Sequence, residues 1–326
     1  MGHFWVSWGT FAAQALTLVV LLVVAVVVTG RLVSRGRHTE EGHLEVRDLG
    51  RRQDEMSRAV SLAMLPKSAG RRARRAIRHQ PADPGERPAL FVLDFAGDIR
   101  ASRAASLREE ITAVLSVATP ADEVLLRLSN PGGTVNDQGF AASQLLRLRA
   151  RGIPLTVAVD TMAASGGYMM AAVANRIVAA PFAVVGSIGV ITVIPNVHRL
   201  LDRAGVDVEQ FTAGRYKRTV TVLGKNTDED RAKLTEELDD THALFKEWVT
   251  AHRPQVDIER VGTGEHWYGT RAIELGLVDE LQTSDDYIQH RRPTHRVYEL
   301  HYRVRLPAAR RLLASLNRAA GTPLRW

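Results

Sequence analysis

The stretch "DTMAASGGYMMA", residues Asp160–Ala171, places one serine among alanines and glycines where an extended run gives way to an apolar, helix-like one. In such a strand–turn–helix context, the N–H of Gly166 and the positive end of the helix dipole lie beside the hydroxyl of Ser165. Two roles fit a serine at this position: a helix cap, or a nucleophile with small residues around it. The stretch by itself leaves both open.

Short β-branched runs alternate with helical patterns on both sides of this stretch. Alternation of this kind favours βαβ crossovers and a mostly parallel sheet, so we predict an α/β fold. A longer amphipathic helix follows, and Thr227 and Asp230 resemble a capping box at its start. The predicted strands are residues 90–95, 123–128, 155–159, 176–180, 189–194 and 206–211, and the predicted helices are residues 106–117, 138–151, 166–174 and 228–253.

The composition excludes several kinds of chemistry. The 326 residues are 45% hydrophobic, include no cysteine and carry a formal net charge of +7. Without cysteine there are no disulfides, thiolate metal sites or cysteine nucleophiles. Basic residues gather in residues 67–78 and after Tyr287, which predicts solvated segments or contact with anionic lipid. No nucleic-acid-binding motif accompanies them, so we expect no nucleic-acid partner.

The N-terminus predicts a membrane anchor. Residues 1–30 contain no Lys, Arg, Asp or Glu, and the apolar run in residues 11–29 is long enough to cross the hydrocarbon layer of a bilayer. Three arginines follow the run, and by the positive-inside rule they place the rest of the chain in the cytoplasm. We predict a single-pass anchor in residues 1–38, a charged flexible linker in 39–89 with one helix near 56–65, a folded domain in 90–284 and a basic extension in 285–326.

Two further stretches bear on the role of the serine. In "LSNPGGTV", residues Leu128–Val135, the N–H of Gly132 or Gly133 can receive an oxyanion, and a plain turn is the alternative. None of the eleven histidines lies in a pattern that marks a Ser/His/Asp triad. A lysine is the remaining candidate for the base: "TAGRYKRTV" holds Lys217, for which a basic surface loop is the alternative.

These stretches, in their order along the chain, resemble the signal peptide peptidase A family of membrane-bound serine proteases, and within it the SohB branch. "GSIGVI", residues Gly186–Ile191, and "GEHWYGTRAIELGLVDE", residues Gly264–Glu280, belong to the same resemblance. It implies a superhelix of βαβ units similar to Clp proteases and crotonases. It also implies a Ser/Lys dyad, with Ser165 as the nucleophile and Lys217 as the general base.

The resemblance extends to the groups around the dyad. Ser187 matches the serine that helps to orient the lysine, and Gly166 matches one oxyanion donor. The Pro-Gly-Gly turn supplies the other donor, through Gly132 or Gly133. No metal or cofactor is implied.

The resemblance implies an endopeptidase of the bacterial cytoplasmic membrane that cleaves unfolded or membrane-derived peptides, such as remnant signal peptides, within a homo-oligomer. Family members generally act outside the cytoplasm, whereas the arginines after the anchor favour the inside. The apolar residues 190–197 predict either a buried strand or a surface for substrate or a second copy of the chain. A crotonase-like acyl-CoA enzyme and an inactive membrane scaffold are the competing functions.

Overall fold

The computed structural model describes residue 17, residues 42–65 and residues 87–304. Within these ranges, no helix is both long and apolar enough to cross a membrane. Apart from residue 17, the predicted anchor helix in residues 11–29 lies outside the described residues, as do the basic run in 67–78 and the end of the extension in 305–326. The chain divides into two compact units. Residues 45–301 form the larger unit. In the described part of the smaller unit, the N–H of Gly42 donates a hydrogen bond to the hydroxyl of Tyr302 at 3.0 Å.

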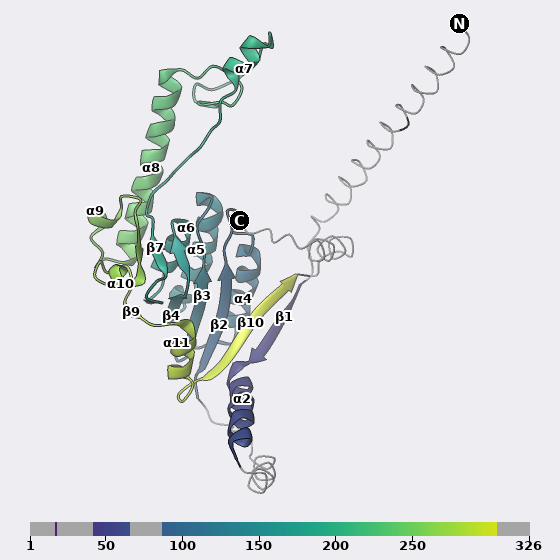
Figure 1. The fold of residues 1–326 in the computed structure, drawn as a ribbon, viewed down its shortest axis with the longest axis vertical. Coiled ribbons are helices and arrows are strands. Elements are labelled where there is room, and N and C mark those ends of the chain that lie inside the picture. Colours follow the sequence, from purple (N-terminus) through teal and green to yellow (C-terminus); the bar gives the residue numbers. More distant parts are fainter. Residues whose placement is uncertain (1–16, 18–41, 66–86, 305–326) are drawn as a thin grey trace. The chain divides into compact units, whose positions relative to one another are not determined.

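A seven-stranded sheet forms the centre of the fold, in the order β1-β10-β2-β3-β4-β6-β9 (Figure 1). From β10 to β9 every neighbouring pair is parallel, which confirms the predicted α/β class with a mostly parallel sheet. The strands are β1 (Gly42–Asp48), β10 (Arg296–Val304), β2 (Ala89–Ala96), β3 (Glu123–Ser129), β4 (Leu155–Val159), β6 (Arg176–Ala179) and β9 (Glu280–Leu281).

A second sheet of three strands and nine helices complete the described part of the chain. The second sheet consists of β5 (Met162–Ala164), β7 (Val184–Gly186) and β8 (His266–Tyr268). The helices are α2 (Leu49–Met64), α4 (Ala104–Val117), α5 (Val135–Ala150), α6 (Gly166–Ala172), α7 (His198–Arg203), α8 (Asp228–His252), α9 (Ile258–Val261), α10 (Gly269–Ala272) and α11 (Ser284–Arg291).

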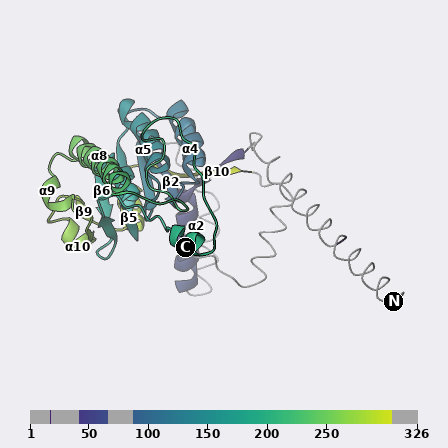
Figure 2. The ribbon, with the colours of Figure 1, turned by 90° about the horizontal axis from the view of Figure 1, so that it is seen from above.

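The central strands β2, β3 and β4 are buried on both faces, as expected where helices cover both sides of a parallel sheet. Phe91, Leu93 and Phe95 of β2 belong to the larger apolar core, to which α4, α5, α6 and α8 also contribute. Leu90 and Val92 point the other way and join a smaller core with residues of α11. Figure 2 shows α4, α5 and α8 lying in one row along the sheet.

The fold extends beyond the limits that the sequence suggested. The predicted linker contains β1 as well as α2, which confirms the helix predicted near 56–65 but begins earlier, and the predicted basic extension contains most of α11 and all of β10. In β10, Arg296 pairs with Ala89 and Val297 with Leu90, and the side chains of Val297 and Leu300 are buried. Only some side chains of β10 contribute to a core, and charged residues stand between them. The apolar pattern that predicts a strand is therefore interrupted in this part of the sequence.

Two predicted strands are wrong. Residues 189–194 and residues 206–211 form no strand, and the chain between β7 and α7 leaves the sheets. Ile191 is 84% exposed and Val193 is 83% exposed. A β-branched run forms a strand only where a neighbour offers hydrogen bonds and a surface to pack against, and these residues have neither. Of the two alternatives for residues 190–197, the buried strand is therefore excluded.

The long helix α8 begins as predicted and packs along only part of its length. The side chain of Thr227 accepts from the N–H of Asp230, and the Asp230 carboxylate accepts from the N–H of Thr227, which confirms the capping box. Of its 25 residues only Phe245 and Val249 are buried. The C-terminal part of α8 therefore belongs to the core, while its N-terminal part extends away from the sheet toward α7 (Figure 1).

An ion pair between the buried Arg253 and the partly exposed Asp279 fixes the end of α8. The guanidinium of Arg253 donates to both oxygens of the Asp279 carboxylate, at 2.7 and 2.8 Å, and to the carbonyl of Gly276 at 3.0 Å. The same carboxylate accepts from the N–H of Ile177, the first buried residue of β6. Burial raises the pKa of the neighbouring Tyr168 phenol, which stays protonated and donates to the carbonyl of Leu277.

We predict that Arg253→Met destabilises the fold. The substitution removes the hydrogen bonds from the buried guanidinium to the Asp279 carboxylate and to the Gly276 carbonyl, and loss of hydrogen bonds that involve charged groups costs about 3 kcal/mol. In a domain of this size that corresponds to a fall of roughly 6–12 °C in the melting midpoint, measured by differential scanning fluorimetry on the purified chain.

The matched control is Arg176→Met. Arg176 forms an exposed ion pair with Glu280 on the adjoining strands. Removal of an exposed pair costs less than about 1 kcal/mol, so this variant should melt within about 4 °C of the wild type. Equal melting midpoints for the two variants would contradict the role given to Arg253.

Candidate functional site

Ser165 lies between β5 and α6, as the sequence predicted. Its backbone has φ 53° and ψ −121°, a conformation that residues other than glycine rarely adopt. Its N–H donates to the carbonyl of Gly186 at 2.8 Å, and its carbonyl accepts from the N–H of Met169 at 3.0 Å. Such a conformation costs on the order of 1–3 kcal/mol and persists only where its surroundings impose it.

The hydroxyl of Ser165 does not cap the helix. Ser165 occupies the N-cap position of α6, but its side chain accepts no hydrogen bond from the first turn. Its Oγ has no hydrogen-bond partner among the residues that the structure describes. Of the two roles open at the sequence level, the cap is therefore excluded, and a strained serine with a free hydroxyl remains.

The Pro-Gly-Gly turn lies directly against this serine. A Cβ on Gly132 would come within 2.8 Å of the Ser165 Cβ and within 3.0 Å of the Gly166 nitrogen. Gly132 also has φ 93°, so only glycine suits this position. A Cβ on Gly133 would lie 2.1 Å from the carbonyl oxygen of Ile99. The contacts bring the turn, the serine and the start of α6 together.

The two glycines of the turn differ in their N–H groups. The N–H of Gly132 donates to Oδ1 of Asn130 at 2.9 Å and is thereby occupied. The N–H of Gly133 and the N–H of Gly166 have no acceptor among the described residues. Gly166 is the first residue of α6, where the helix leaves its N–H groups without an internal partner. Gly133 and Gly166 therefore offer two free donors beside Ser165.

An apolar cavity of about 270 Å³ adjoins Ser165. Helices α5, α6 and α8 enclose it, together with the glycine turn and the chain after β7. Trp248 on α8 closes one side, and its indole N–H donates to the carbonyl of Met169 at 3.0 Å. The residues around the cavity are Gly133, Val135, Gly139, Ser143, Leu146, Ser165, Gly166, Met169, Gly189, Val190, Thr241, Leu244, Phe245 and Trp248.

Ser187 follows β7 at the level of Ser165. Because Ala164 pairs with Gly186 in the parallel β5–β7 ladder, the two serines are the next residues on neighbouring strands. Ser187 also has a positive φ, 52°, and its N–H donates to the carbonyl of Glu265 at 2.6 Å. The structure thus brings Ser187 into the same region as Ser165, and its role as an orienting group stays a prediction.

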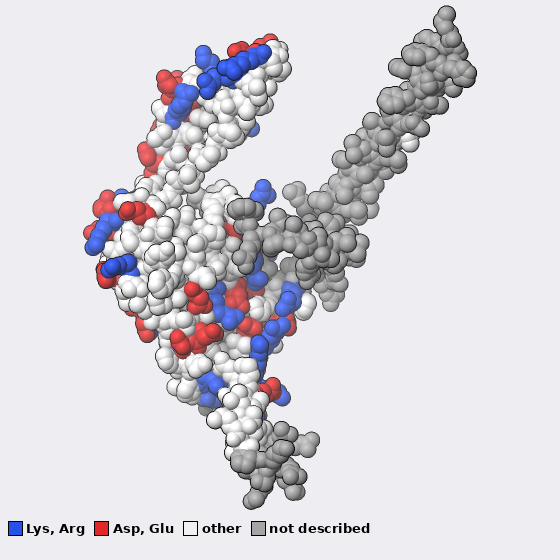
Figure 3. Space-filling model, in the orientation of Figure 1, with Lys and Arg blue, Asp and Glu red and all other residues white. Residues whose placement is uncertain are grey.

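Lys217 is not brought to Ser165 within one chain. It is exposed, lies between α7 and α8, and takes no part in the cavity. Its N–H donates to the carbonyl of Gly214 in a local turn. Figure 1 shows α7 beyond the N-terminal end of α8, which is the end remote from α6. Figure 3 shows Lys and Arg side chains gathered where the segment between β7 and α8 is farthest from the sheets.

We call residues 190–227 the arm. Several large apolar side chains of the arm are exposed to solvent. Exposed apolar surface of this kind is typical of a protein–protein interface. The aromatic ring of Tyr216, next to Lys217, lies 5.0 Å from the charged groups of both Arg215 and Lys233. The exposed large apolar residues of the arm are Ile191, Val193, Leu200, Val206, Val208, Phe211, Tyr216, Val222 and Leu223.

Three side chains near Ser165 were not singled out by the sequence. Asn130 and Gln138 are fully buried and hydrogen-bond to each other at 2.8 Å, and Trp248 contacts α6. The position of Asn130 directly before the Pro-Gly-Gly turn was a usable signal. Nothing in the local pattern of α5 or α8 distinguishes Gln138 or Trp248 from ordinary helix residues.

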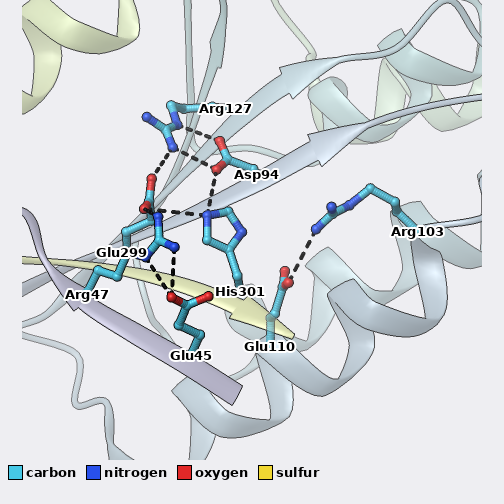
Figure 4. Close-up of polar contacts among 8 residues, drawn as sticks. All are labelled: Glu45, Arg47, Asp94, Arg103, Glu110, Arg127, Glu299 and His301. Atoms are coloured by element: carbon cyan, nitrogen blue, oxygen red, sulfur yellow. Dashed lines mark hydrogen bonds and ion pairs between the residues drawn. The ribbon is translucent and has the colours of Figure 1, made fainter. Parts of the chain in front are cut away.

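One cluster among the described residues has ligand atoms close enough to hold a metal ion: Asp94, Glu299 and His301. Arg127 donates to both carboxylates, at 2.5 and 2.7 Å for Asp94 and 2.5 Å for Glu299 (Figure 4). Its guanidinium thus already supplies a cation there. Asp94 and Arg127 alternate with the residues of the larger core, so the cluster lies on the face of the sheet away from α5 and α6.

The comparisons with known proteins agree on one family. Peptidase family S49 matches residues 147–297, and the N-terminal part of Peptidase family S49 matches residues 3–145. The "Probable protease SohB" of Haemophilus influenzae is 47% identical over 317 residues, which cover 92% of this chain and 89% of that protein. That of Buchnera aphidicola subsp. Schlechtendalia chinensis is 56% identical over 201 residues, covering 62% of this chain and 66% of that protein.

A solved structure of a 1510-N membrane-bound stomatin-specific protease in complex with a substrate peptide is also similar. It covers 72% of this chain and all of its own, at 11% identity and a TM-score of 0.44, and a likeness this low adds nothing on fold or function. The sequence matches confirm the resemblance to the signal peptide peptidase A family and its SohB branch. The chain belongs to peptidase family S49.

Proposed function

We propose that this peptidase is a membrane-anchored serine endopeptidase with a Ser/Lys dyad, which cleaves unfolded or membrane-derived peptides such as remnant signal peptides. One observation carries the proposal: the free hydroxyl of Ser165 and the free N–H groups of Gly133 and Gly166 belong to residues that line the same apolar cavity. We also propose that the α/β fold is the superhelix of Clp proteases and crotonases. The predicted anchor places the enzyme in the bacterial cytoplasmic membrane.

The reaction follows from the groups at the site. Neutral Lys217 takes the proton of Ser165, and Oγ attacks the carbonyl carbon of a peptide bond. The carbonyl oxygen becomes an oxyanion that accepts from the N–H groups of Gly133 and Gly166. The C–N bond then breaks, Lys217 returns the proton to the leaving amine, and an ester to Ser165 remains. Water, deprotonated by Lys217, attacks that ester, and the serine recovers its proton.

A second copy of the chain brings the lysine to the serine in this proposal. Lys217 lies on the arm, apart from the cavity of its own chain, and the arm carries exposed apolar side chains that a neighbouring copy would cover. Head-to-tail contacts of this type build a ring when the rotation between neighbouring copies closes. Ser187 of the receiving subunit lies next to Ser165, where its hydroxyl can accept a hydrogen bond from the arriving lysine.

The cavity supports a preference for apolar side chains at the cleavage site. Its lining combines Leu146, Met169, Phe245 and Trp248 with glycines and three hydroxyl residues, and no charged residue contributes. Burial of an apolar side chain there is favourable, and a charged one would lose its hydration without a partner. An unfolded segment that formerly spanned a membrane offers apolar side chains along its length.

The dyad predicts that Ser165→Ala and Lys217→Ala each lower kcat for peptide hydrolysis by at least about 1000-fold, because nucleophile and base act as a unit. The assay uses the full chain in detergent or vesicles with a fluorogenic apolar peptide. Lys225→Ala is the matched control, since Lys225 is another exposed lysine of the arm, and it should leave kcat unchanged.

A mixing experiment tests the source of the lysine. Oligomers assembled from equal amounts of the Ser165→Ala and Lys217→Ala chains should regain about a quarter of the wild-type activity, because a site formed between two copies draws each group from a different chain. No recovery in mixed oligomers would place both groups in one chain. Full activity of either single variant would contradict the Ser/Lys dyad. A wild-type chain that hydrolyses no peptide or ester would favour the alternative function, an inactive membrane scaffold.

Gly139 offers a test of the cavity. It lies on α5 at the cavity wall, and no atom lies within 4 Å of a Cβ placed on it. Gly139→Leu should fill the cavity without disturbing the helix, for which leucine is the better former. We expect kcat/KM for a peptide with leucine at the cleavage site to fall about 10- to 100-fold relative to one with alanine.

The smaller change Gly139→Ala serves as the control for this experiment. It should stabilise α5 by up to about 1 kcal/mol and reduce the preference for leucine only slightly. An unchanged ratio of the two substrates in Gly139→Leu would show that the cavity does not receive the side chain next to the cleaved bond.

A further inference from the structure

We propose that Asn130, held by Gln138, is a positioning residue that fixes the oxyanion turn against the nucleophile. The inference rests on the proposed function and concerns a side chain that touches neither substrate nor the reacting atoms. Its basis is a chain of three hydrogen bonds that runs through the interior and ends on the turn.

The three hydrogen bonds have a fixed direction. Nε2 of Gln138 donates to the carbonyl of Asp98 at 2.9 Å, and Oε1 of Gln138 accepts from Nδ2 of Asn130 at 2.8 Å. Oδ1 of Asn130 then accepts from the N–H of Gly132 at 2.9 Å. Since each amide can donate only from nitrogen and accept only at oxygen, the carbonyl of Asp98 sets the orientation of both side chains.

The backbone of Asn130 is tied to the strand that carries the nucleophile. Its N–H donates to the carbonyl of Met162 at 2.8 Å, and its carbonyl accepts from the N–H of Ala164 at 3.0 Å. Ser165 is the next residue. One residue therefore holds the serine strand through its backbone and the oxyanion turn through its side chain.

The surroundings leave Asn130 little freedom. It is fully buried, and a Cβ on Gly97 would come within 2.2 Å of its side chain, while a Cβ on Gly167 would come within 2.2 Å of its carbonyl oxygen. Buried amides are stabilising only when their polar atoms are paired. Both polar atoms of the Asn130 side chain are paired, and Nδ2 also lies 3.3 Å from Sδ of Met170.

This arrangement has a consequence for the transition state. Because the N–H of Gly132 is occupied by Asn130, the turn cannot rotate that group toward the serine, and the N–H of Gly133 stays free. Loss of the Asn130 amide releases the turn. The oxyanion forms only in the transition state, so a misplaced donor should weaken its stabilisation and leave binding of the intact peptide nearly unchanged.

The experiment compares Asn130→Leu and Gln138→Met with the wild type, all as full chains of equal oligomer size. For each variant we expect kcat to fall about 10- to 100-fold, since a displaced donor costs less than a lost one. KM should stay within about threefold. The affinity for a peptide aldehyde, whose adduct with Ser165 places an oxyanion in the same site, should fall by the same factor as kcat/KM.

Gln144→Met is the matched control, because Gln144 is another largely buried glutamine of α5 and has no hydrogen bond to the turn. It should leave kcat and aldehyde affinity unchanged. Gln138→Met keeps the test decisive if Asn130→Leu does not fold. Wild-type kcat and aldehyde affinity in a folded Gln138→Met or Asn130→Leu chain would overturn the inference.

The outcome separates this inference from the proposed function. A wild type that Ser165→Ala inactivates, together with fully active Asn130 and Gln138 variants, would overturn only the positioning role. Retained activity in Ser165→Ala would overturn the proposed function itself. A rise in KM equal to the loss in kcat/KM, with kcat unchanged, would assign Asn130 to ground-state binding and so contradict the inference as well.

Discussion

The short parallel pairing of β5 with β7 holds Ser165 in a backbone conformation that a serine adopts only under constraint. Hydrogen bonds from Ser165 to Gly186 and from Ala164 to Asn130 fix the chain on both sides of the turn. With its backbone held in this way, the side chain of Ser165 does not hydrogen-bond to the first turn of α6. The free hydroxyl, the free N–H of Gly166 and the close approach of the Pro-Gly-Gly turn all depend on this constraint.

Helix α8 connects this constraint to the rest of the molecule. Trp248 and His242 contact the backbone carbonyls of Met169 and Ile188, and Arg253 ties the end of the helix to the main sheet through Asp279. At its other end α8 carries the arm. A helix that packs in the core at its C-terminal end and is exposed at its N-terminal end, next to the arm, is suited to link assembly of copies with completion of the site.

The sequence predicted the parts of the fold whose signal is local. The helix after Ser165, the parallel sheet and the capping box at Thr227 follow from alternation and end signals over a few residues. β10 was missed because its charged residues interrupt the apolar pattern and because its partner β2 lies some 200 residues earlier. The apolar residues 189–194 predicted a strand, but no neighbouring strand reaches them.

The site was predictable in its residue types and less so in its geometry. Small residues around Ser165 and in the Pro-Gly-Gly turn indicate close backbone approach, and the structure brings these two stretches together. The choice between Gly132 and Gly133 depends on the side chain of Asn130, a contact that no spacing reveals. The position of Lys217 depends on the arm, whose exposed apolar surface has no partner within the described chain.

The most direct test of the account is covalent labelling of the full chain with a fluorophosphonate, followed by peptide mapping by mass spectrometry. A strained serine with a free hydroxyl and two oxyanion donors should give one adduct, on Ser165, and heat-unfolded protein should give none. An adduct on another serine, such as Ser187, or no adduct on a preparation that hydrolyses peptides, would contradict the assignment of Ser165 as the nucleophile.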